Sequence, residues 1–394
     1  MNILAFSSLF STLLFICSYL IRLGNYYSFA EFITFSFFLF FIFSNILLLY
    51  FRRAHVKVVP NIADLLVFSL VVLALLSLIY AGPTNDGFLY LGQLIIYGIL
   101  PYVILRLVPR ESSECRYLFW SAALLLILSV FILSFVIGFA DLFVRFRLGG
   151  EIINPVGVGS IYLILSLFML GAMYYANTGS SRFCYAILLL VSASMVFLSG
   201  SRSSIMAMLL VAVFGFMTKS KISLLKTCLV LTTATFLVNT FQFSEIDTDI
   251  FARYTKVFSG DIFVSGSGSE RINLYSLSVN MIAENPISGI GLYGFQSVTG
   301  GLYPHNLFLE ILLSFGIPFG SLIIMLMILS VASPYNYLKI RQNDPRLTLV
   351  FILVAILMVK MLSFNIAQLK DFLIILGLLV SFTSEKNKIK LRSV

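Results

Sequence analysis

Long apolar runs alternate with short polar connections along the whole chain. Runs of about 17 to 25 apolar residues recur, which is the length that an α-helix needs to cross roughly 30 Å of hydrocarbon. These runs consist of consecutive Leu, Ile and Phe residues, whereas the strands of a membrane β-barrel show only a weak alternation of apolar and polar residues. The pattern predicts an all-α polytopic membrane protein with twelve spans, at residues 3–21, 29–51, 62–81, 87–108, 117–139, 155–176, 183–199, 203–218, 222–240, 305–331, 347–363 and 367–383.

One long polar segment, residues 241–304, interrupts this pattern between the ninth and tenth spans. Its GSGS stretch at 266–269 predicts a flexible joint. The next residues have helical periodicity, and Pro286 stops the pattern. We expect a short amphipathic helix on the membrane surface, with one apolar face made of Ile272, Tyr275, Val279 and Ile282. The loop then acts as a lid within a single integral membrane domain, residues 1–394, and is not a separate domain.

The charge pattern predicts the orientation of the chain. Only 11% of the residues are charged and the mean hydropathy is +1.02, unlike a soluble domain. Most Lys and Arg residues fall in loops after even-numbered spans, so both termini and these loops are expected in the cytoplasm. This bias explains the net charge of +9 without nucleic acid as a partner. The first span carries no basic segment before it and is expected to stay uncleaved. Lys360 and Lys370 flank the last outer turn and are expected to snorkel.

Arg202 is the first candidate functional residue, in the serine-rich turn of residues 199–204. Only sixteen residues separate it from Lys219, which is expected in the cytoplasm. Sixteen residues of helix cover about 24 Å, less than the hydrocarbon thickness of roughly 30 Å. Either the bilayer thins here or Arg202 lies in a water-filled cavity below the outer surface, where a cation marks a functional site. The alternative is an ordinary arginine at the outer interface.

Three further arginines lie in segments predicted outside, against the basic bias. Arg145 and Arg147 precede the sixth span, and their alternative role is a solvated or headgroup contact. Arg271 begins the predicted loop helix, where a cation opposes the helix dipole. An anion bound there would use both the guanidinium and the free amides of the first turn. The alternative for Arg271 is a plain surface charge.

His305 stands where the tenth span begins, followed by Asn306, with Glu310 further into the span. A neutral imidazole there can accept a proton from an attacking hydroxyl, or it can serve only as an interfacial anchor. Glu310 is either a second base or a buried helix contact. Residues 289–294 match GxGxxG, but no strand precedes them, so they predict close turns and not a dinucleotide site.

Motifs for ATP hydrolysis, zinc proteases, serine hydrolases and metal-dependent sugar-nucleotide binding are missing from the sequence. We therefore expect the outer face to use neither ATP nor a nucleotide sugar, and we expect no cofactor. The outer arginines favour an anionic ligand that is already bound to the membrane, held as a diphosphate would be.

Four blocks in this order resemble the superfamily of O-antigen polymerases and O-antigen ligases. They are RLGGEIINP at 147–155, FLSGSRSS at 197–204, RINLY…AENPISGIGLYGF at 271–295 and PHNLFLEILLSFGIPFG at 304–320. The resemblance implies a GT-C-like fold and a metal-independent, inverting glycosyltransferase in the bacterial inner membrane. Its substrates would be undecaprenyl-diphosphate-linked glycans, and its active site would face the periplasm.

Within that resemblance, Arg202 and Arg271 would hold the diphosphate and His305 would deprotonate or orient the acceptor hydroxyl. Arg145 or Arg147 would support a second lipid diphosphate, with Asn306 and Glu310 among the substrate-binding residues. The form of the helix start at 304–310 favours a polymerase, which joins lipid-linked repeat units and can work with a chain-length regulator. A ligase, which moves the glycan to lipid A-core, is the alternative. A lipid-linked oligosaccharide flippase is a further one, although no related halves are evident.

Overall fold

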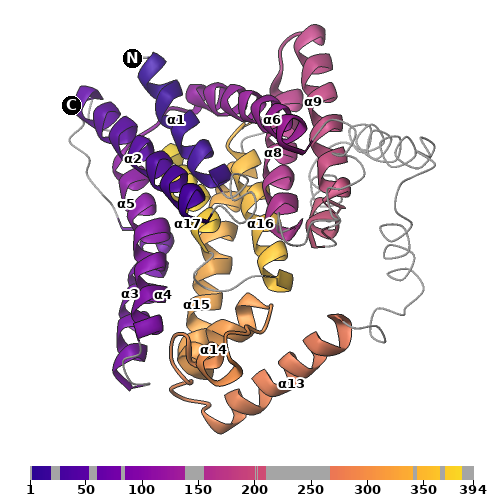
Figure 1. The fold of residues 1–394 in the computed structure, drawn as a ribbon. Helices are drawn as coiled ribbons and strands as arrows, with labels where there is room; N and C mark the ends of the chain where they lie inside the picture. Colours follow the sequence, from indigo (N-terminus) through magenta and orange to yellow (C-terminus); the bar gives the residue numbers. More distant parts are fainter. Residues whose placement is uncertain are drawn as a thin grey trace, which may run out of the picture.

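The computed structural model describes residues 2–18, 27–52, 60–80, 85–137, 155–199, 201, 203–209, 267–339, 344–363 and 369–383. All regular structure within these residues is helical (Figure 1). A π-helical turn, Ile95–Ile99, joins α4 to α5 within one continuous span. The α-helices are α1 (Asn2–Cys17), α2 (Tyr27–Arg52), α3 (Ile62–Tyr80), α4 (Asn85–Leu94), α5 (Leu100–Leu107), α6 (Cys115–Ile137), α8 (Pro155–Tyr175), α9 (Gly179–Leu198), α13 (Ser267–Glu284), α14 (Gly294–Thr299), α15 (Leu307–Lys339), α16 (Leu347–Ser363) and α17 (Lys370–Thr383).

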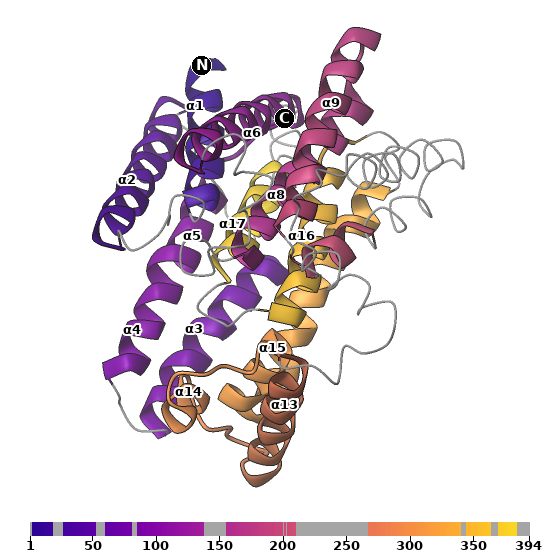
Figure 2. The same cartoon turned by 45° about the vertical axis from the view of Figure 1, so that its right-hand side comes forward.

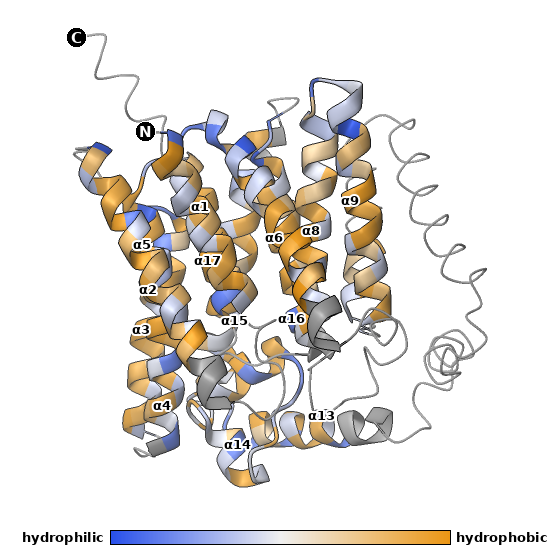
Figure 3. Cartoon of the chain, turned by 45° about the horizontal axis from the view of Figure 1, so that its top comes forward, coloured by the Kyte–Doolittle hydropathy of each residue, from blue (hydrophilic) through white to orange (hydrophobic). Residues whose placement is uncertain are grey.

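Seven helical segments of the described part are long and apolar enough to cross a membrane. Residues 2–17 and 347–360 form shorter apolar helices. Figure 3 shows hydrophobic residues along most of the bundle. The prediction of a polytopic all-α membrane protein is therefore confirmed. The number of spans stays a prediction, because the eighth predicted span is described only over residues 203–209 and the ninth lies outside the described residues.

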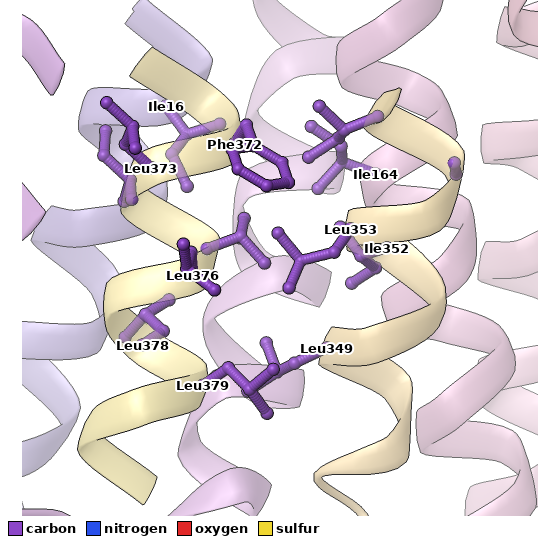
Figure 4. Packing of buried hydrophobic residues seen from close by; sticks show 14 of the residues in the cluster. Ile16, Ile164, Leu349, Ile352, Leu353, Phe372, Leu373, Leu376, Leu378 and Leu379 are labelled. Carbon is purple, nitrogen blue, oxygen red and sulfur yellow. The ribbon is translucent and has the colours of Figure 1, made fainter. Parts of the chain in front are cut away.

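α17 lies at the centre of the bundle. Every residue from Asp371 to Phe382 is buried, and the helix packs against α5, α16 and α1. Figure 4 shows two leucines of α17, Leu376 and Leu379, beside Leu349 and Leu353 of α16. Lipid tails are as apolar as leucine, so this packing stabilises the bundle through close van der Waals contact more than through exclusion of water.

Two helices lie outside the bundle, at one end of it. Figures 1 and 2 show α13 running across this end and α14 lying near the start of α15. Both helices pack against α15. We call this end, which carries α13 and α14, the loop face. The structure therefore places helix in the predicted lid, although residues 241–266 of the loop lie outside the described residues.

Polar side chains join helices at the end opposite the loop face. Arg110 is buried and its Nη2 donates to Ser8 Oγ of α1 at 2.6 Å and to Asn45 Oδ1 of α2 at 2.9 Å. Its backbone N–H donates to Ser381 O of α17 at 3.1 Å. One arginine thus connects three helices, and its buried charge makes these hydrogen bonds costly to remove.

A buried ion pair joins α16 to α17. Lys360 is 2% exposed, and its Nζ lies 3.3 Å from Asp371 Oδ2. Lys370 Nζ donates to Ser18 Oγ at 3.4 Å and lies 5.4 Å from the centroid of the Phe15 ring. The expected snorkelling is wrong for Lys360, because an acidic partner inside the bundle holds its ammonium there.

Candidate functional site

His305 lies in the short connection between α14 and α15, on the loop face. Its φ of 52° is left-handed, a conformation that costs a residue with a side chain about 1–2 kcal/mol. Such strain persists only where the surroundings enforce it, and it gathers at functional sites. The imidazole is partly buried and its centroid lies 4.1 Å from that of the Tyr303 ring. The ring is therefore held in place and can accept a proton from a hydroxyl that reaches it.

Asn306 caps the start of α15. Its Oδ1 accepts the backbone N–H groups of Phe308 at 3.0 Å and Leu309 at 3.2 Å. The first amides of a helix have no intrahelical partner, so this cap satisfies two of them. The sequence suggested a substrate contact for Asn306. The geometry gives its oxygen a structural task, which is to fix where α15 begins beside His305.

Glu310 lies in the first turn of α15 and is 2% exposed. Its Oε1 accepts a hydrogen bond from Tyr90 Oη of α4 at 2.7 Å and another from Gln296 Nε2 of α14 at 2.8 Å. The sequence left two roles open, a second base or a buried helix contact. The burial and the two hydrogen bonds favour the buried contact, because a side chain that is 2% exposed is poorly placed to reach a substrate hydroxyl.

The GxGxxG segment forms turns against α15, as predicted for these glycines. Gly289 and Gly291 have φ values of 69° and 85°. The N–H of Ile290 donates to Leu313 O at 2.7 Å. A Cβ at Gly289 would lie 2.6 Å from the backbone nitrogen of Gly316, so only glycine allows this approach.

The helical backbone of α15 is interrupted where it contacts this turn. Gly316 has φ 74° and ψ 175°, which interrupts the helical backbone. The freed N–H of Ile317 donates to Pro286 O at 2.7 Å. We call these paired segments, residues 286–291 and 313–317, the glycine clasp. It fastens the C-terminal end of α13 to α15.

α13 confirms the predicted loop helix in part. It begins at Ser267, so three residues of the GSGS stretch lie in the helix and do not form a joint before it. Tyr275 and Ile282 are partly buried, as expected for the apolar face, but Val279 is 55% exposed. Ser278 is buried on this side of α13 instead. The packing of α13 on α15 therefore buries a side of the helix that is not its most apolar one.

The serine turn follows α9 and packs tightly against α8. Ser199, Ser201 and Ser204 are buried, and Ser201 and Ser204 share a hydrogen bond of 2.9 Å. Gly159 of α8 allows this approach, because a Cβ there would lie 2.6 Å from Ser201 Cβ. The described serines of this turn are thus held against α8.

The four predicted arginines are not placed relative to His305. Arg202, Arg145 and Arg147 lie outside the described residues. Arg271 lies in α13, and its side chain is outside the described part. The structure brings together His305, Asn306 and Glu310 at the start of α15, and the assignment of the arginines stays a prediction.

Sequence reasoning missed Tyr90 and Gln296. Tyr90 is a buried tyrosine within an apolar span, and its hydroxyl requires a hydrogen-bond partner there. That requirement was the available signal, but it does not identify the partner. Gln296 lies in a six-residue helix that the sequence did not predict.

Metal binding finds no support in the described residues. No group of three or more His, Cys, Asp and Glu residues there could hold a metal ion. Independence of metal stays a prediction, because the loop before α13 lies outside the described part.

A comparison with protein families matches residues 187–324 to the family described as O-antigen ligase. The matched segment begins in α9, contains the serine turn and α13, and ends within α15. The resemblance to the superfamily of O-antigen polymerases and ligases is therefore confirmed. Arg145, Arg147 and Tyr90 lie outside the match. A comparison with curated proteins finds no match.

Proposed function

We propose that this chain is a polysaccharide polymerase of the O-antigen or capsule type. It transfers a glycan from undecaprenyl diphosphate to a hydroxyl of a second lipid-linked repeat unit. The acceptor oxygen forms a bond to the anomeric carbon, the bond from that carbon to the diphosphate oxygen breaks, and undecaprenyl diphosphate leaves. Attack from the opposite side inverts the anomeric configuration, and neither metal nor nucleotide takes part.

His305 takes the proton of the acceptor hydroxyl in this reaction. Arg202 and Arg271 bind the diphosphate and stabilise the charge that grows on it as it leaves. Arg145 or Arg147 supports the diphosphate of the second lipid. The lipid carriers are then the main partners, and a chain-length regulator acts on the same product.

One observation carries this proposal. The family match spans the serine turn, α13 and the start of α15, and within it His305 is held in a strained backbone conformation on the loop face. Strain of this kind is common at active sites. The family description by itself names a ligase, so ligation to lipid A-core is the second candidate.

An assay with purified protein in detergent distinguishes the polymerase from the ligase. Given only lipid-linked repeat units, a polymerase makes a ladder of longer lipid-linked chains. Product that forms only after lipid A-core is added favours the ligase. No product under either condition, with movement of lipid-linked glycan across vesicles, favours the flippase.

The catalytic assignment is tested with the two histidines of the chain. His305→Ala should abolish the ladder, because no other group is proposed to take the proton. His55→Ala is the matched control, since His55 lies in a basic loop predicted on the cytoplasmic side, and it should give normal chain lengths. A normal ladder from His305→Ala contradicts the assignment.

Localisation in the inner membrane, with the loop face toward the periplasm, is tested by cysteine labelling of intact cells. Leu302 lies on the loop face and is 54% exposed, so Leu302→Cys should react with a membrane-impermeant maleimide. Native Cys184, exposed near the start of α9, lies on the predicted cytoplasmic side and should react only after permeabilisation. The reverse pattern contradicts the orientation.

A further inference from the structure

Three separate helices meet at one oxygen atom beside the candidate site. Oε1 of Glu310 in α15 accepts from the Tyr90 hydroxyl of α4 and from the Gln296 amide of α14, at 2.7 and 2.8 Å. Tyr90, Gln296 and Glu310 are 7%, 4% and 2% exposed. A buried polar group that loses its hydrogen-bond partner costs free energy, and each of these two hydrogen bonds gives Glu310 a partner inside the protein. This junction is therefore expensive to break.

The same junction lies beside a strained part of the backbone. Tyr293 and His305 are the two residues with side chains that have a left-handed φ in the described part of the chain, at 67° and 52°. Tyr293 directly precedes α14 and His305 follows it, so the strained residues flank the helix that Gln296 ties to Glu310. The Tyr90 ring also packs on the Tyr293 ring, with centroids 5.6 Å apart.

We infer that Tyr90 is a positioning residue for the transfer reaction. Through Glu310 and Gln296 it fixes α14 and the connection that leads to His305, and so it sets the direction of the imidazole. The inference rests on the proposed function and adds to it a residue outside the matched family segment. It also assigns Glu310 to the support of the site and not to proton transfer.

Tyr90→Phe tests this most directly, because it keeps the ring on Tyr293 and removes only the hydroxyl. The kcat for polymerisation should fall about 10- to 100-fold, the size expected when a catalytic group is misplaced by about an ångström. The KM for the lipid-linked repeat unit should change little, because no substrate contact is lost. Gln296→Leu removes the other donor from a different helix and should have the same effect.

Tyr80→Phe is the matched control. Tyr80, at the end of α3, donates to the backbone carbonyl of Ser314 in α15 at 3.0 Å. It therefore also contributes a hydroxyl to α15 at the loop face, but not to Glu310. Its loss should leave kcat unchanged. A Tyr90→Phe protein with the same kcat as Tyr80→Phe overturns the inference.

A second measurement reads the position of His305 without any transfer reaction. In a His55→Ala background, His305 is the one histidine left in the sequence, so diethyl pyrocarbonate modification followed by mass spectrometry reports on it alone. Tyr90→Phe and Gln296→Leu should change the modification rate several-fold, and Tyr80→Phe should not. An unchanged rate in both variants overturns the inference even if their activity falls.

These two measurements separate the inference from the function on which it rests. If the native protein makes no ladder, the polymerase proposal fails, whereas the modification rate still shows whether Tyr90 positions His305. If the ladder forms and both variants behave as native in both assays, the positioning role fails alone.

Discussion

Gly316 lies so close to Ile287 that a Cβ at the glycine would be 2.5 Å from the carbonyl carbon of Ile287. Both residues belong to the glycine clasp that fastens the end of α13 to α15. Gly316→Ala should therefore separate the two segments or fail to fold, because the neighbouring atoms are backbone and cannot move aside cheaply. We expect loss of the polysaccharide ladder together with a lower unfolding temperature in detergent.

Gly300→Ala is the control for a left-handed glycine without a collision; Gly300 has ψ 36°, whereas Gly316 has ψ 175°, in a region that essentially only glycine adopts. Gly300 has φ 69°, close to the 74° of Gly316, but no atom lies within 4 Å of its Cβ position. Its replacement should cost only the left-handed penalty of about 1–2 kcal/mol. Equal unfolding temperatures for the two variants would show that close contact in the clasp is unimportant.

Gly159→Ala should disturb the serine turn from the side of α8. The new methyl would meet Ser201 Cβ at 2.6 Å and Ser204 Oγ at 2.8 Å, and the turn that carries Arg202 would move. We expect about 10-fold less polymerisation from this displacement, with the protein still folded, since alanine favours helix. Gly179→Ala at the start of α9, with no atom within 4 Å, should match the native protein in the same ladder assay. Native chain length from Gly159→Ala would refute the link between this packing and activity.

Replacement of Asn306 distinguishes a cap from a substrate contact. Asn306→Ala should lower the free energy of unfolding by about 1 kcal/mol, because two amides of α15 lose their acceptor. Asn306→Ser and Asn306→Asp keep a capping oxygen and should restore both the unfolding temperature and the ladder. Inactive but fully stable Ser and Asp variants would instead identify Asn306 as a substrate ligand.

The pair of Lys360 and Asp371 gives a prediction about stability. Lys360→Met leaves the Asp371 carboxylate buried without this partner, which typically costs about 3–5 kcal/mol. The double variant with Asp371→Leu should recover much of the loss, since an apolar pair of similar volume suits the core. Thermal unfolding in detergent checks both, and a stable Lys360→Met protein would show that the pair does not support the bundle.

The elements of the fold were largely predictable from local pattern. The length of an apolar run indicates a membrane helix, because the thickness of the hydrocarbon layer determines how long such a helix must be. The glycines at 289 and 291 indicate turns, because glycine, which has no Cβ, readily adopts the left-handed backbone of tight turns. His305 and Asn306 were predicted at the start of a span, and α15 begins just after them at Leu307.

Contacts between distant helices were not predictable in the same way. Nothing near Tyr90 in the sequence indicates Glu310, since their meeting depends on how α4 and α15 pack and not on either helix alone. The burial of Ser278 in place of Val279 has the same origin, because the docking of α13 decides which side faces inward. The burial of Lys360 depends on Asp371 of the next helix.

The central place of α17 has a consequence for how the protein is made. α17 is the last of the described helices to be synthesised, yet it fills the middle of the bundle and receives the backbone contact of Arg110 at Ser381. Helices in the bilayer associate through packing contacts, so the contacts of α5, α16 and α1 with α17 can form only after α17 has been made. A nascent chain that has reached only residue 369 therefore still lacks the helix at the centre of the bundle.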